Sequence, residues 1–468
     1  MNYMDMMRRQ DRTRLALIED GREYTYGQLI MLSEQISHNV TVFSSEPVSG
    51  KIHWICRETI AEQLIEFMAA NERGEIPVIV PEERKEVLLI ASAEREAGSQ
   101  DVGPAINMPL VLAGQKQEVE DTKICMGVMT SGSTGEPKVL WRSYESWANY
   151  FTIQNQIFGI HEGSRLLAQG SLAFTGNLNM YLAAFFVGAA IVAQNKFQPR
   201  EWETLIDKYQ INGIYLIPSK LMCIPRVIRR IYPAVKSIIS GSQGMNRTDA
   251  VQLKKIFPNA DLTLYYGASE LSYISYITAE EMTDDRGLVG KAFPGVQVEV
   301  REQQIYVTTS CCVAGVKCPY TVSDQGYLDE SGRLHFTGRS DGVVRVHGHK
   351  VSLWRIEKVL TEQPEIQSVV VLNLPNQKSF HGQQRKDYSE LQSEGDRTSP
   401  AQVHYNRVAF VVLQNHRQID SAFLKRLRSK LSSYEMPGHF VTLPELPYRE
   451  NGKIDTEKLQ KIWQDKTL

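Results

Sequence analysis

The sequence is short of features that mark several specialised classes of protein. Only six of its 468 residues are cysteines, with no Cys-x-x-Cys pair and none of the density of a secreted disulfide scaffold. The longest apolar run, residues 181–193, is shorter than the roughly 20 residues of a membrane-spanning helix. The N-terminus lacks the apolar core of a signal peptide. We therefore expect a cytoplasmic protein without a membrane span, in which residues 181–193 form a buried core element.

An excess of charge of either sign is also missing. The chain has 52 Lys and Arg against 54 Asp and Glu, for a formal net charge of −2. Such a balance provides no bulk attraction for nucleic acid or for an anionic membrane. Any phosphate must be bound by local groups, and we expect small molecules rather than nucleic acid as partners.

Three of the cysteines, Cys311, Cys312 and Cys318, lie close together, with His347 and His349 downstream. A metal site is one interpretation of this cluster. Its spacing fits no zinc-binding pattern, so we favour reduced structural thiols.

Length and pattern together indicate more than one domain. A chain of this length exceeds the roughly 100–200 residues of one ordinary domain. A strand turning into a helix is predicted over residues 22–40. Strands then alternate with helices, which is typical of a parallel sheet whose ligands bind beyond the carboxyl ends of its strands, where Gly241 and Gly267 fall. Helices are predicted at residues 202–209, 224–231 and 248–257, and strands at residues 213–218, 235–239 and 262–266.

The sequence changes character after Gly338. Short β-rich segments at residues 343–346, 369–372 and 408–413 alternate with predicted helices at residues 353–360 and 421–431. We interpret this part as a smaller α+β domain. Residues 376–402 are polar and almost free of aliphatic side chains, which predicts a mobile insertion between two strands.

The strongest local motif is a loop rich in glycine and hydroxyl side chains that ends in a lysine. Its glycines let backbone N–H groups approach an anion, the hydroxyl groups add donors and the lysine adds a point charge, which suits the polyphosphate of ATP. It is not a Walker A loop, and a plain Ser/Gly connection is the alternative. The motif consists of Thr130, Ser131, Gly132, Ser133, Thr134, Gly135, Glu136, Pro137 and Lys138.

This motif resembles the phosphate loop of the adenylate-forming superfamily, which includes acyl-CoA synthetases, peptide-synthetase adenylation domains and luciferases. Residues 266–270, Tyr-Gly-Ala-Ser-Glu, resemble the family's Tyr-Gly-x-Thr-Glu. The resemblance implies that Tyr266 stacks on adenine, beside Gly267, and that Ser269 bonds the α-phosphate. Glu270 would bind Mg²⁺, for which carboxylate oxygen is a suitable ligand. A surface glutamate on an ordinary turn is the alternative.

Later motifs follow in the family's order. Asp324 stands where the family has the ribose-binding Asp of Thr-Gly-Asp, although Val322 and Ser323 replace the Thr-Gly. Residues 338–342 resemble Gly-Arg-x-Asp-Asp, which implies that Arg339 contacts ribose or phosphate and that Asp341 is the hinge between domains.

Two motifs of the C-terminal part complete the series. Residues 348–351 with 356–357 resemble the segment that moves toward the active site for the thioester step. Residues 451–455 resemble the C-terminal Gly-Lys-Ile motif, which makes Lys453 the catalytic lysine, with a solvated turn as the alternative.

The resemblance covers about residues 25–459 and implies both a fold and a reaction. The fold is α/β, with a large N-terminal domain of stacked β-sheets and helices (residues 1–339) and a small, mobile α+β C-terminal lid domain (residues 340–468). The reaction is an attack of a carboxylate on ATP with Mg²⁺, assisted by Thr130, Glu270 and Lys453. The acyl group then passes to coenzyme A or to the phosphopantetheine of an acyl or peptidyl carrier protein.

The acyl pocket implied by the resemblance is neutral. Its predicted lining includes Phe174, Thr175, Asn177, Gln243 and Ala268, and the neighbouring Gly241 and Ser242 are placed beside the nucleotide. Amino-acid activators usually have Asp where Thr175 stands, and the His of many acyl-CoA synthetases is absent as well. We expect an acyl-CoA synthetase acting on a fatty or other aliphatic acid, with an aryl acid as the alternative.

Other interpretations stay open. The early position of Thr130 and the insertion at residues 376–402 either alter the choice between coenzyme A and a carrier protein or are variations in loop length. A catalytically silent nucleotide-binding scaffold is a different class of function, against which Lys453 and Glu270 argue. A phosphotransferase is disfavoured because no Walker A or kinase-type loop is present.

Overall fold

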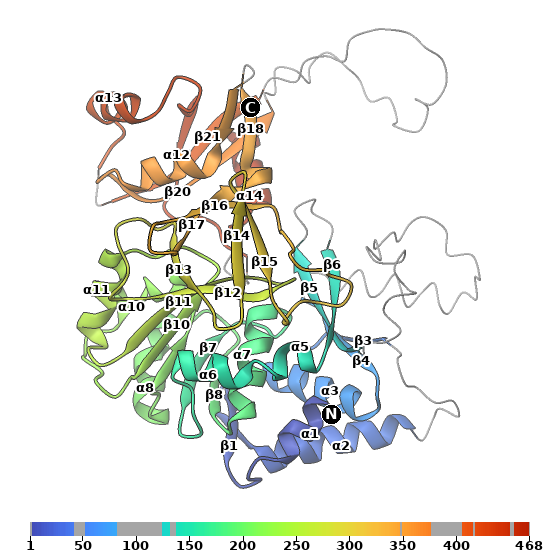
Figure 1. Ribbon diagram of the computed structural model, residues 1–468. Helices are drawn as coiled ribbons and strands as arrows, with labels where there is room; N and C mark the ends of the chain where they lie inside the picture. Colours follow the sequence, from blue (N-terminus) through green and yellow to red (C-terminus); the bar gives the residue numbers. More distant parts are fainter. Residues whose placement is uncertain are drawn as a thin grey trace, which may run out of the picture. The chain divides into compact units, whose positions relative to one another are not determined.

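The computed structural model describes residues 2–41, 52–81, 124–131, 137–346, 349–375, 405–414, 417–449 and 454–467. Contacts within the chain divide it into two units (Figure 1). The first unit comprises residues 1–322 and 326–336. The second comprises residues 323–325 and 337–468.

A large mixed sheet forms the frame of the first unit. Within the described residues it has 13 strands, in the order β14-β15-β16-β17-β13-β12-β11-β10-β9-β7-β8-β1-β2. Strands β1, β8, β7, β9, β10 and β11 run parallel, as the alternation of strands and helices predicted. The bounds are β1 (Leu15–Glu19), β2 (Arg22–Thr25), β7 (Arg165–Gln169), β8 (Ala190–Gln194), β9 (Gly213–Tyr215), β10 (Ser237–Gly241), β11 (Asp261–Ala268), β12 (Ser272–Thr278), β13 (Leu288–Ala292), β14 (Gln297–Arg301), β15 (Gln304–Thr308), β16 (Asp324–Leu328) and β17 (Leu334–Arg339).

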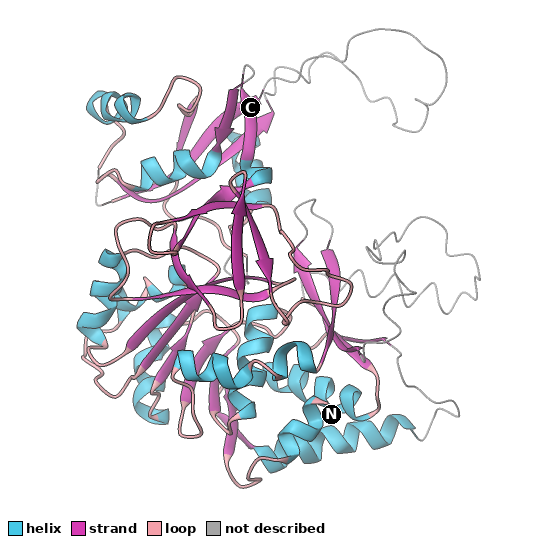
Figure 2. Ribbon diagram, viewed as in Figure 1, coloured by secondary structure: helices cyan, strands magenta, loops and turns pink. Residues whose placement is uncertain are grey.

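Different helices cover the two faces of this sheet (Figure 2). Neighbouring residues of a strand point to opposite faces. In β10, Ile239 packs in the same buried cluster as Phe158, whereas Ile238 packs with Trp202 and Leu253. The first face carries α5 (Glu145–Ala148), α6 (Phe151–Phe158) and α7 (Thr175–Phe186), and the second carries α8 (Trp202–Tyr209), α9 (Pro218–Leu221), α10 (Ile224–Val227) and α11 (Arg247–Ile256).

A smaller sheet in the first unit carries the strands that flank the predicted phosphate loop. Its order is β3-β4-β5-β6, with β3 (Ile52–Ile55), β4 (Ile76–Ile79), β5 (Ile124–Ser131) and β6 (Pro137–Ser143). Helices α1 (Tyr3–Arg8), α2 (Tyr26–Thr41) and α3 (Ile60–Glu72) lie in the same unit. A capping box between Thr59 and Glu62 starts α3, and the buried Glu19 carboxylate accepts hydrogen bonds from two N–H groups of its first turn.

The second unit is a small α+β domain. Strands β20, β21 and β22 form one sheet, and β18 pairs with β19. Ser352 caps α12 and Asp420 caps α13, as their side-chain oxygens accept backbone N–H hydrogen bonds. The bounds are β18 (Val343–Val346), β19 (His349–Ser352), α12 (Leu353–Thr361), β20 (Ile366–Pro375), β21 (Tyr405–Leu413), α13 (Ser421–Lys430), β22 (His439–Thr442) and α14 (Thr456–Thr467).

One predicted helix is wrong in length. A helix was expected over residues 224–231, but α10 ends at Val227. Ile228 leaves the helix in an extended conformation and is buried. The next turn docks on α11 through a hydrogen bond of 2.7 Å from the N–H of Tyr232 to the carbonyl of Ile256. The tertiary contact therefore overrides the local helical pattern.

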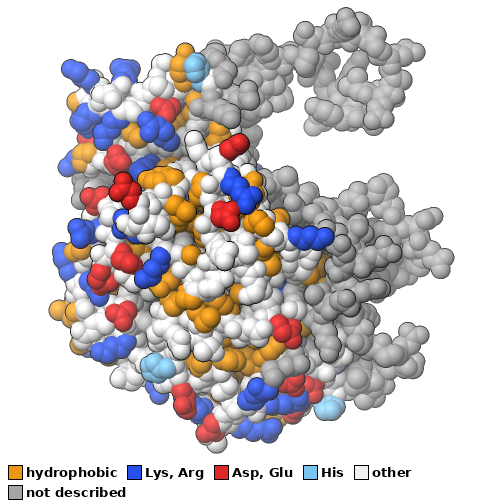
Figure 3. All heavy atoms as spheres, viewed as in Figure 1, with side chains coloured by type: hydrophobic (Ala, Val, Ile, Leu, Met, Phe, Trp, Pro, Cys, Tyr) orange, Lys and Arg blue, Asp and Glu red, His pale blue; other side chains and the backbone are white. Residues whose placement is uncertain are grey.

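The apolar run at residues 181–193 lies in the core, as predicted. It supplies the buried second half of α7 and most of β8. Among the residues that the structure describes, no helix combines the length and apolar character needed to cross a membrane. On the face shown in Figure 3, cationic and anionic side chains are interspersed, in keeping with the small net charge.

Candidate active site

The predicted nucleotide motif forms the tip of a hairpin between β11 and β12. Tyr266, Gly267 and Ala268 end β11, and a hydrogen bond of 3.1 Å from the N–H of Leu271 to the carbonyl of Ala268 closes the turn. A Cβ atom on Gly267 would lie 2.4 Å from the carbonyl oxygen of Ser272. Glycine is therefore required here by the close approach of two backbones.

Arg142, in strand β6, binds this turn through a hydrogen bond to its backbone. Its buried guanidinium donates to the carbonyl of Ser269 at 2.6 Å and to the carbonyl of Cys311 at 2.9 Å, and it lies 4.8 Å from the centre of the Trp147 ring. Burial lowers its pKa to about 10, which leaves it charged at neutral pH. The motifs did not point to this residue, because an arginine in strand β6 is expected to face solvent.

Two residues of the turn keep part of their surface accessible. Tyr266 is half-buried, and its ring centre lies 5.8 Å from that of Phe336. Glu270 is also half-buried, and its carbonyl accepts a hydrogen bond of 2.9 Å from the N–H of Val313. The backbone of Glu270 is thus fixed while the residue keeps part of its surface accessible, as a metal ligand requires. Among the described residues, no cluster of three or more His, Cys, Asp or Glu side chains forms a metal site within the protein itself.

The predicted acyl segment lies against this turn. The Ser269 hydroxyl donates to the Thr175 hydroxyl at 3.3 Å, although the two residues are 94 positions apart. Phe174 forms an isolated parallel bridge with Met129, the neighbour of Thr130 in β5. The structure therefore brings together the start of α7, the hairpin tip and the end of the strand that enters the predicted phosphate loop.

Other predicted pocket residues make local contacts. Gly241 ends β10 next to β11, and the exposed Ser242 follows with φ of +70°, a left-handed conformation that costs a serine free energy. The Gln243 side chain accepts a hydrogen bond of 2.9 Å from the N–H of Ser219. The Asn177 amide donates to the carbonyl of Ser171 at 3.1 Å. Gln243 and Asn177 therefore shape the loops around the site.

Asp324 and Arg339 lie in the second unit, and the Arg339 guanidinium approaches the buried Asp324 carboxylate to 3.8 Å. Ser323 has φ of +66°. Its carbonyl accepts two hydrogen bonds from Ser340, at 2.9 Å from the N–H and at 2.8 Å from the hydroxyl. Ser323 thus keeps a backbone conformation that favours glycine, at the position where the resemblance expected one.

The structure does not describe several of the predicted site residues. Gly132, Ser133, Thr134, Gly135 and Lys453 lie outside the described residues, as do the insertion at residues 376–402 and the side chains of Ser131, Lys138 and Asp341.

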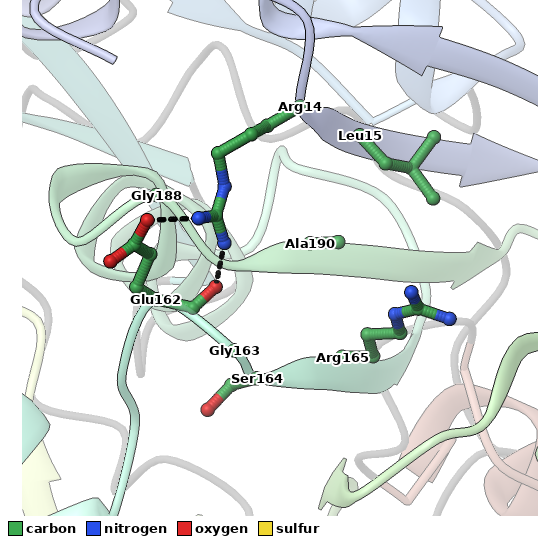
Figure 4. Close-up of a pocket in the computed structure, with 8 residues that line it drawn as sticks. All are labelled: Arg14, Leu15, Glu162, Gly163, Ser164, Arg165, Gly188 and Ala190. Atoms are coloured by element: carbon green, nitrogen blue, oxygen red, sulfur yellow. Dashed lines mark hydrogen bonds and ion pairs between the residues drawn. The ribbon is translucent and has the colours of Figure 1, made fainter. Parts of the chain in front are cut away.

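A separate pocket of about 260 Å³ lies at the amino ends of the parallel strands of the large sheet (Figure 4). It is lined by the first residues of three parallel strands, Leu15, Arg165 and Ala190, whereas the predicted site lies at the carboxyl ends of the parallel strands. An ion pair between Arg14 and Glu162 crosses it. This pocket is not part of the predicted active site.

No disulfide bond joins any of the six cysteines, all of which lie among the described residues. Cys312 and Cys318 lie with their sulfur atoms 3.6 Å apart, and both contact the carbonyl of Thr309. Burial raises the pKa of Cys312 to about 11.

Comparison with known proteins places the chain in a family. Residues 40–309, more than half of the chain, match the family described as AMP-binding enzyme. The chain is 26% identical to the uncharacterized acyl-CoA ligase YhfT of Bacillus subtilis, over 72% of this chain and 68% of that protein. It is 25% identical to the D-alanine–D-alanyl carrier protein ligase of Lactococcus lactis, over 95% of each.

Solved structures confirm the predicted fold class. O-succinylbenzoate coenzyme A synthetase (MenE) from Bacillus subtilis matches with a TM-score of 0.75 at 17% identity, over 98% of this chain and 99% of that one. MatB from Rhodopseudomonas palustris matches with a TM-score of 0.74 at 17% identity, over 99% of each chain. The chain belongs to the AMP-binding enzyme family and is an adenylate-forming ligase.

Proposed function

We propose that this ligase uses ATP and Mg²⁺ to convert a fatty or other aliphatic acid into an acyl-adenylate and then into a thioester with coenzyme A, in the cytoplasm. The observation that carries the proposal is the contact between Thr175 and Ser269. It brings the neutral acyl segment to the turn that carries Glu270. YhfT, named as an acyl-CoA ligase, supports the choice of coenzyme A.

The first half-reaction must overcome the repulsion between a carboxylate and the phosphates of ATP. In the proposal, the donors of residues 130–138 bind the phosphates and Lys453 bridges the attacking carboxylate and ATP. Mg²⁺ bound to the Glu270 carboxylate would offset phosphate charge, and a partly accessible glutamate on a fixed turn suits that role. Support for ATP and Mg²⁺ comes from MenE, whose structure was solved in complex with both.

The other predicted roles follow the same proposal. Tyr266 and Gly267 bind adenine, with Gly241 and Ser242 beside the nucleotide, while Asp324 and Arg339 bind the ribose. We further propose that residues 340–468 turn about Asp341 between the two half-reactions, relative to residues 1–339. The division of the chain near residue 337 supports this proposal.

The test is carboxylate-dependent exchange between ATP and pyrophosphate, with aliphatic, aryl and amino acids offered separately. We expect aliphatic acids to drive exchange and Lys453→Ala to abolish it. Glu270→Gln should weaken exchange in a way that added Mg²⁺ partly restores. Binding of ATP without exchange for any acid would instead favour the silent scaffold.

A carrier protein is the second candidate acceptor. The similarity to the D-alanine–D-alanyl carrier protein ligase favours it, whereas Thr175 lacks the negative charge expected for an amino-acid substrate. Offering coenzyme A and a phosphopantetheinylated carrier protein to the preformed acyl-adenylate separates the two. Thioester on coenzyme A supports the proposal, and thioester on the carrier alone refutes that part of it.

A further inference from the structure

Two thiols, those of Cys312 and Cys318, lie in the loop that follows β15. The ends of the loop are joined by Val307 and Tyr320, which exchange backbone hydrogen bonds of 2.8 Å and 2.9 Å. The two sulfur atoms are 3.6 Å apart, and they contact the carbonyl of Thr309 at 3.2 Å and 3.5 Å. Both cysteines keep part of their surface accessible, so a small solute can reach them.

The same loop supports the turn that carries Glu270. The N–H of Val313 donates to the carbonyl of Glu270 at 2.9 Å. The carbonyl of Cys311 accepts a hydrogen bond of 2.9 Å from Arg142, which also binds the turn. Cys312 therefore lies directly between two residues whose backbone atoms fix the predicted Mg²⁺ ligand and its supporting arginine.

A metal site is the alternative use of two neighbouring thiols. Tetrahedral zinc takes four protein ligands in structural sites and three in catalytic sites. Within the part of the chain that the structure describes, no third His, Cys, Asp or Glu joins Cys312 and Cys318 in a cluster that could bind a metal ion. Formation of a disulfide needs only the two sulfur atoms, and these are already in contact.

We propose that Cys312 and Cys318 are an oxidative modification site, at which a peroxide forms a disulfide that lowers the activity of the ligase and a thiol reductant restores it. The inference uses the proposed role of Glu270 in the ligase reaction. It assigns a function to a cysteine pair that the reaction itself does not use.

The oxidation proceeds in two balanced steps. One sulfur attacks the O–O bond of hydrogen peroxide and becomes a sulfenic acid, while the departing hydroxide takes up the thiol proton as water. The second sulfur attacks the first, the S–S bond forms and the S–O bond breaks, and a second water leaves with the remaining thiol proton. The two sulfurs together lose two electrons, which reduce the peroxide. Burial raises the pKa of Cys312 to about 11, so we expect Cys318 to attack first.

Formation of the disulfide must move the loop. An S–S bond is about 2.05 Å long, so sulfur atoms that are 3.6 Å apart approach each other by about 1.5 Å. A disulfide has no S–H group, and the carbonyl of Thr309 loses both of its sulfur donors. Because Val307 and Tyr320 hold the ends of the loop, residues 311–313 take up the displacement together with the turn that they bind. A displacement of about 1 Å at a reacting group can lower a rate about 100-fold.

The test measures exchange between ATP and pyrophosphate in reduced protein, after hydrogen peroxide, and after subsequent dithiothreitol. For wild type we expect peroxide to lower the exchange rate about 10- to 100-fold and dithiothreitol to restore it. Cys318→Ser should have the activity of the reduced wild type and should keep it in peroxide. Cys56→Ser is the matched control, because it removes a partly accessible thiol outside the loop, and it should respond as wild type does.

Peptide mass mapping identifies the bond that forms. Trypsin cuts after Lys317, between the two cysteines, so the disulfide should link residues 302–317 to residues 318–333 with the loss of two hydrogens. Cys311→Ser should give the same linked peptides, since the thiol of Cys311 takes no part and its carbonyl is kept. Absence of these linked peptides from that variant would show that Cys311 forms the bond, which overturns the assignment.

Calorimetry of ATP binding in the presence of Mg²⁺ separates this inference from the proposed function. Binding that is about tenfold weaker in oxidised wild type, and unchanged by peroxide in Cys318→Ser, upholds the modification site even where no acid drives exchange, in which case the ligase proposal fails alone. Full exchange and full ATP binding in protein that carries the disulfide overturn the inference, as does equal inhibition of Cys318→Ser by peroxide. Cys318→Ala, with circular dichroism as the folding control, replaces the serine variant if that variant does not fold.

Discussion

The buried guanidinium of Arg142 offers the sharpest test of how the nucleotide turn is held. Arg142→Met keeps the aliphatic stem and removes the charge and its donors. Two carbonyl groups, those of Ser269 and Cys311, then lose hydrogen bonds of 2.6 Å and 2.9 Å. Because both belong to segments that flank Glu270, we expect losses of stability and of activity together.

The expected loss of stability is the difference of opposing contributions. Two hydrogen bonds from a charged donor contribute about 1.5–3 kcal/mol each, and the contact with the Trp147 ring adds about 1–2 kcal/mol. Removing the charge relieves the cost of its burial, and the lowering of its pKa to about 10 corresponds to about 3 kcal/mol of that cost. The net decrease in the free energy of unfolding is therefore about 3 kcal/mol.

The assay is urea unfolding together with exchange kinetics, and Arg230→Met is the matched control. Arg230 also pairs with one acceptor group, Asp207, and lies 5.2 Å from the ring centre of Tyr232, but it is exposed. Because solvent screens an exposed ion pair, its replacement should change the free energy of unfolding far less than Arg142→Met does. For Arg142→Met we expect kcat to fall at least about tenfold, because the turn loses its position. Equal small effects for the two variants would refute the role assigned to Arg142.

Three further predictions concern other residues. Burial raises the pKa of Glu357 to about 7, so its contribution to stability is present below pH 4.5 and is lost as pH rises through 7. In urea unfolding, the free energy of unfolding of Glu357→Gln should rise by about 3 kcal/mol relative to that of wild type across this pH range. Diamide should join Cys312 and Cys318, whose sulfur atoms lie 3.6 Å apart, faster at alkaline than at neutral pH, since the pKa of Cys312 is raised to about 11; intact mass should show the loss of two hydrogens. Ser323→Gly should raise the free energy of unfolding by up to about 1 kcal/mol, because it relieves a φ of +66°.

A specific result would contradict each of these three predictions. A stability difference for Glu357→Gln that does not change with pH would mean that the carboxyl group titrates normally. The same loss of hydrogens in Cys312→Ser would place the disulfide elsewhere. A destabilised Ser323→Gly would show that contacts of the serine side chain outweigh the strain of its backbone.

The sequence predicted best those elements whose signals are local. Helix α8 has the predicted bounds because Trp202, Ile206 and Tyr209 repeat at helical spacing, and all three are buried on one face. The parallel direction of these strands followed from their alternation with helices, whereas their order in the sheet was not predicted. The bounds of β20 exceed the predicted residues 369–372 at both ends, since pairing with β21 extends the strand beyond its apolar centre.

The contacts that shape the site could not be predicted in the same way. The hydroxyl groups of Tyr215 and Tyr265 meet only because β9 and β11 flank β10, and the two residues are 50 positions apart in the chain. No local pattern marks either tyrosine, and neither belongs to a motif. Arg142 was missed for a related reason: its acceptors lie on turns that the sequence does not place near β6.

The motif residues and the residues that fix their backbone, such as Arg142, thus lie in different parts of the sequence. Substitutions in the two groups should therefore have different effects. Three serines near the predicted motifs, Ser242, Ser272 and Ser323, have positive φ, which costs each of them about 1 kcal/mol or more. Such conformations persist only where surrounding contacts determine them, and beside the hairpin tip Arg142 provides two of these contacts. A substitution of Arg142 should lower kcat because the turn that carries Glu270 loses its fixed position, whereas a substitution in the proposed acyl pocket should change which acid is used.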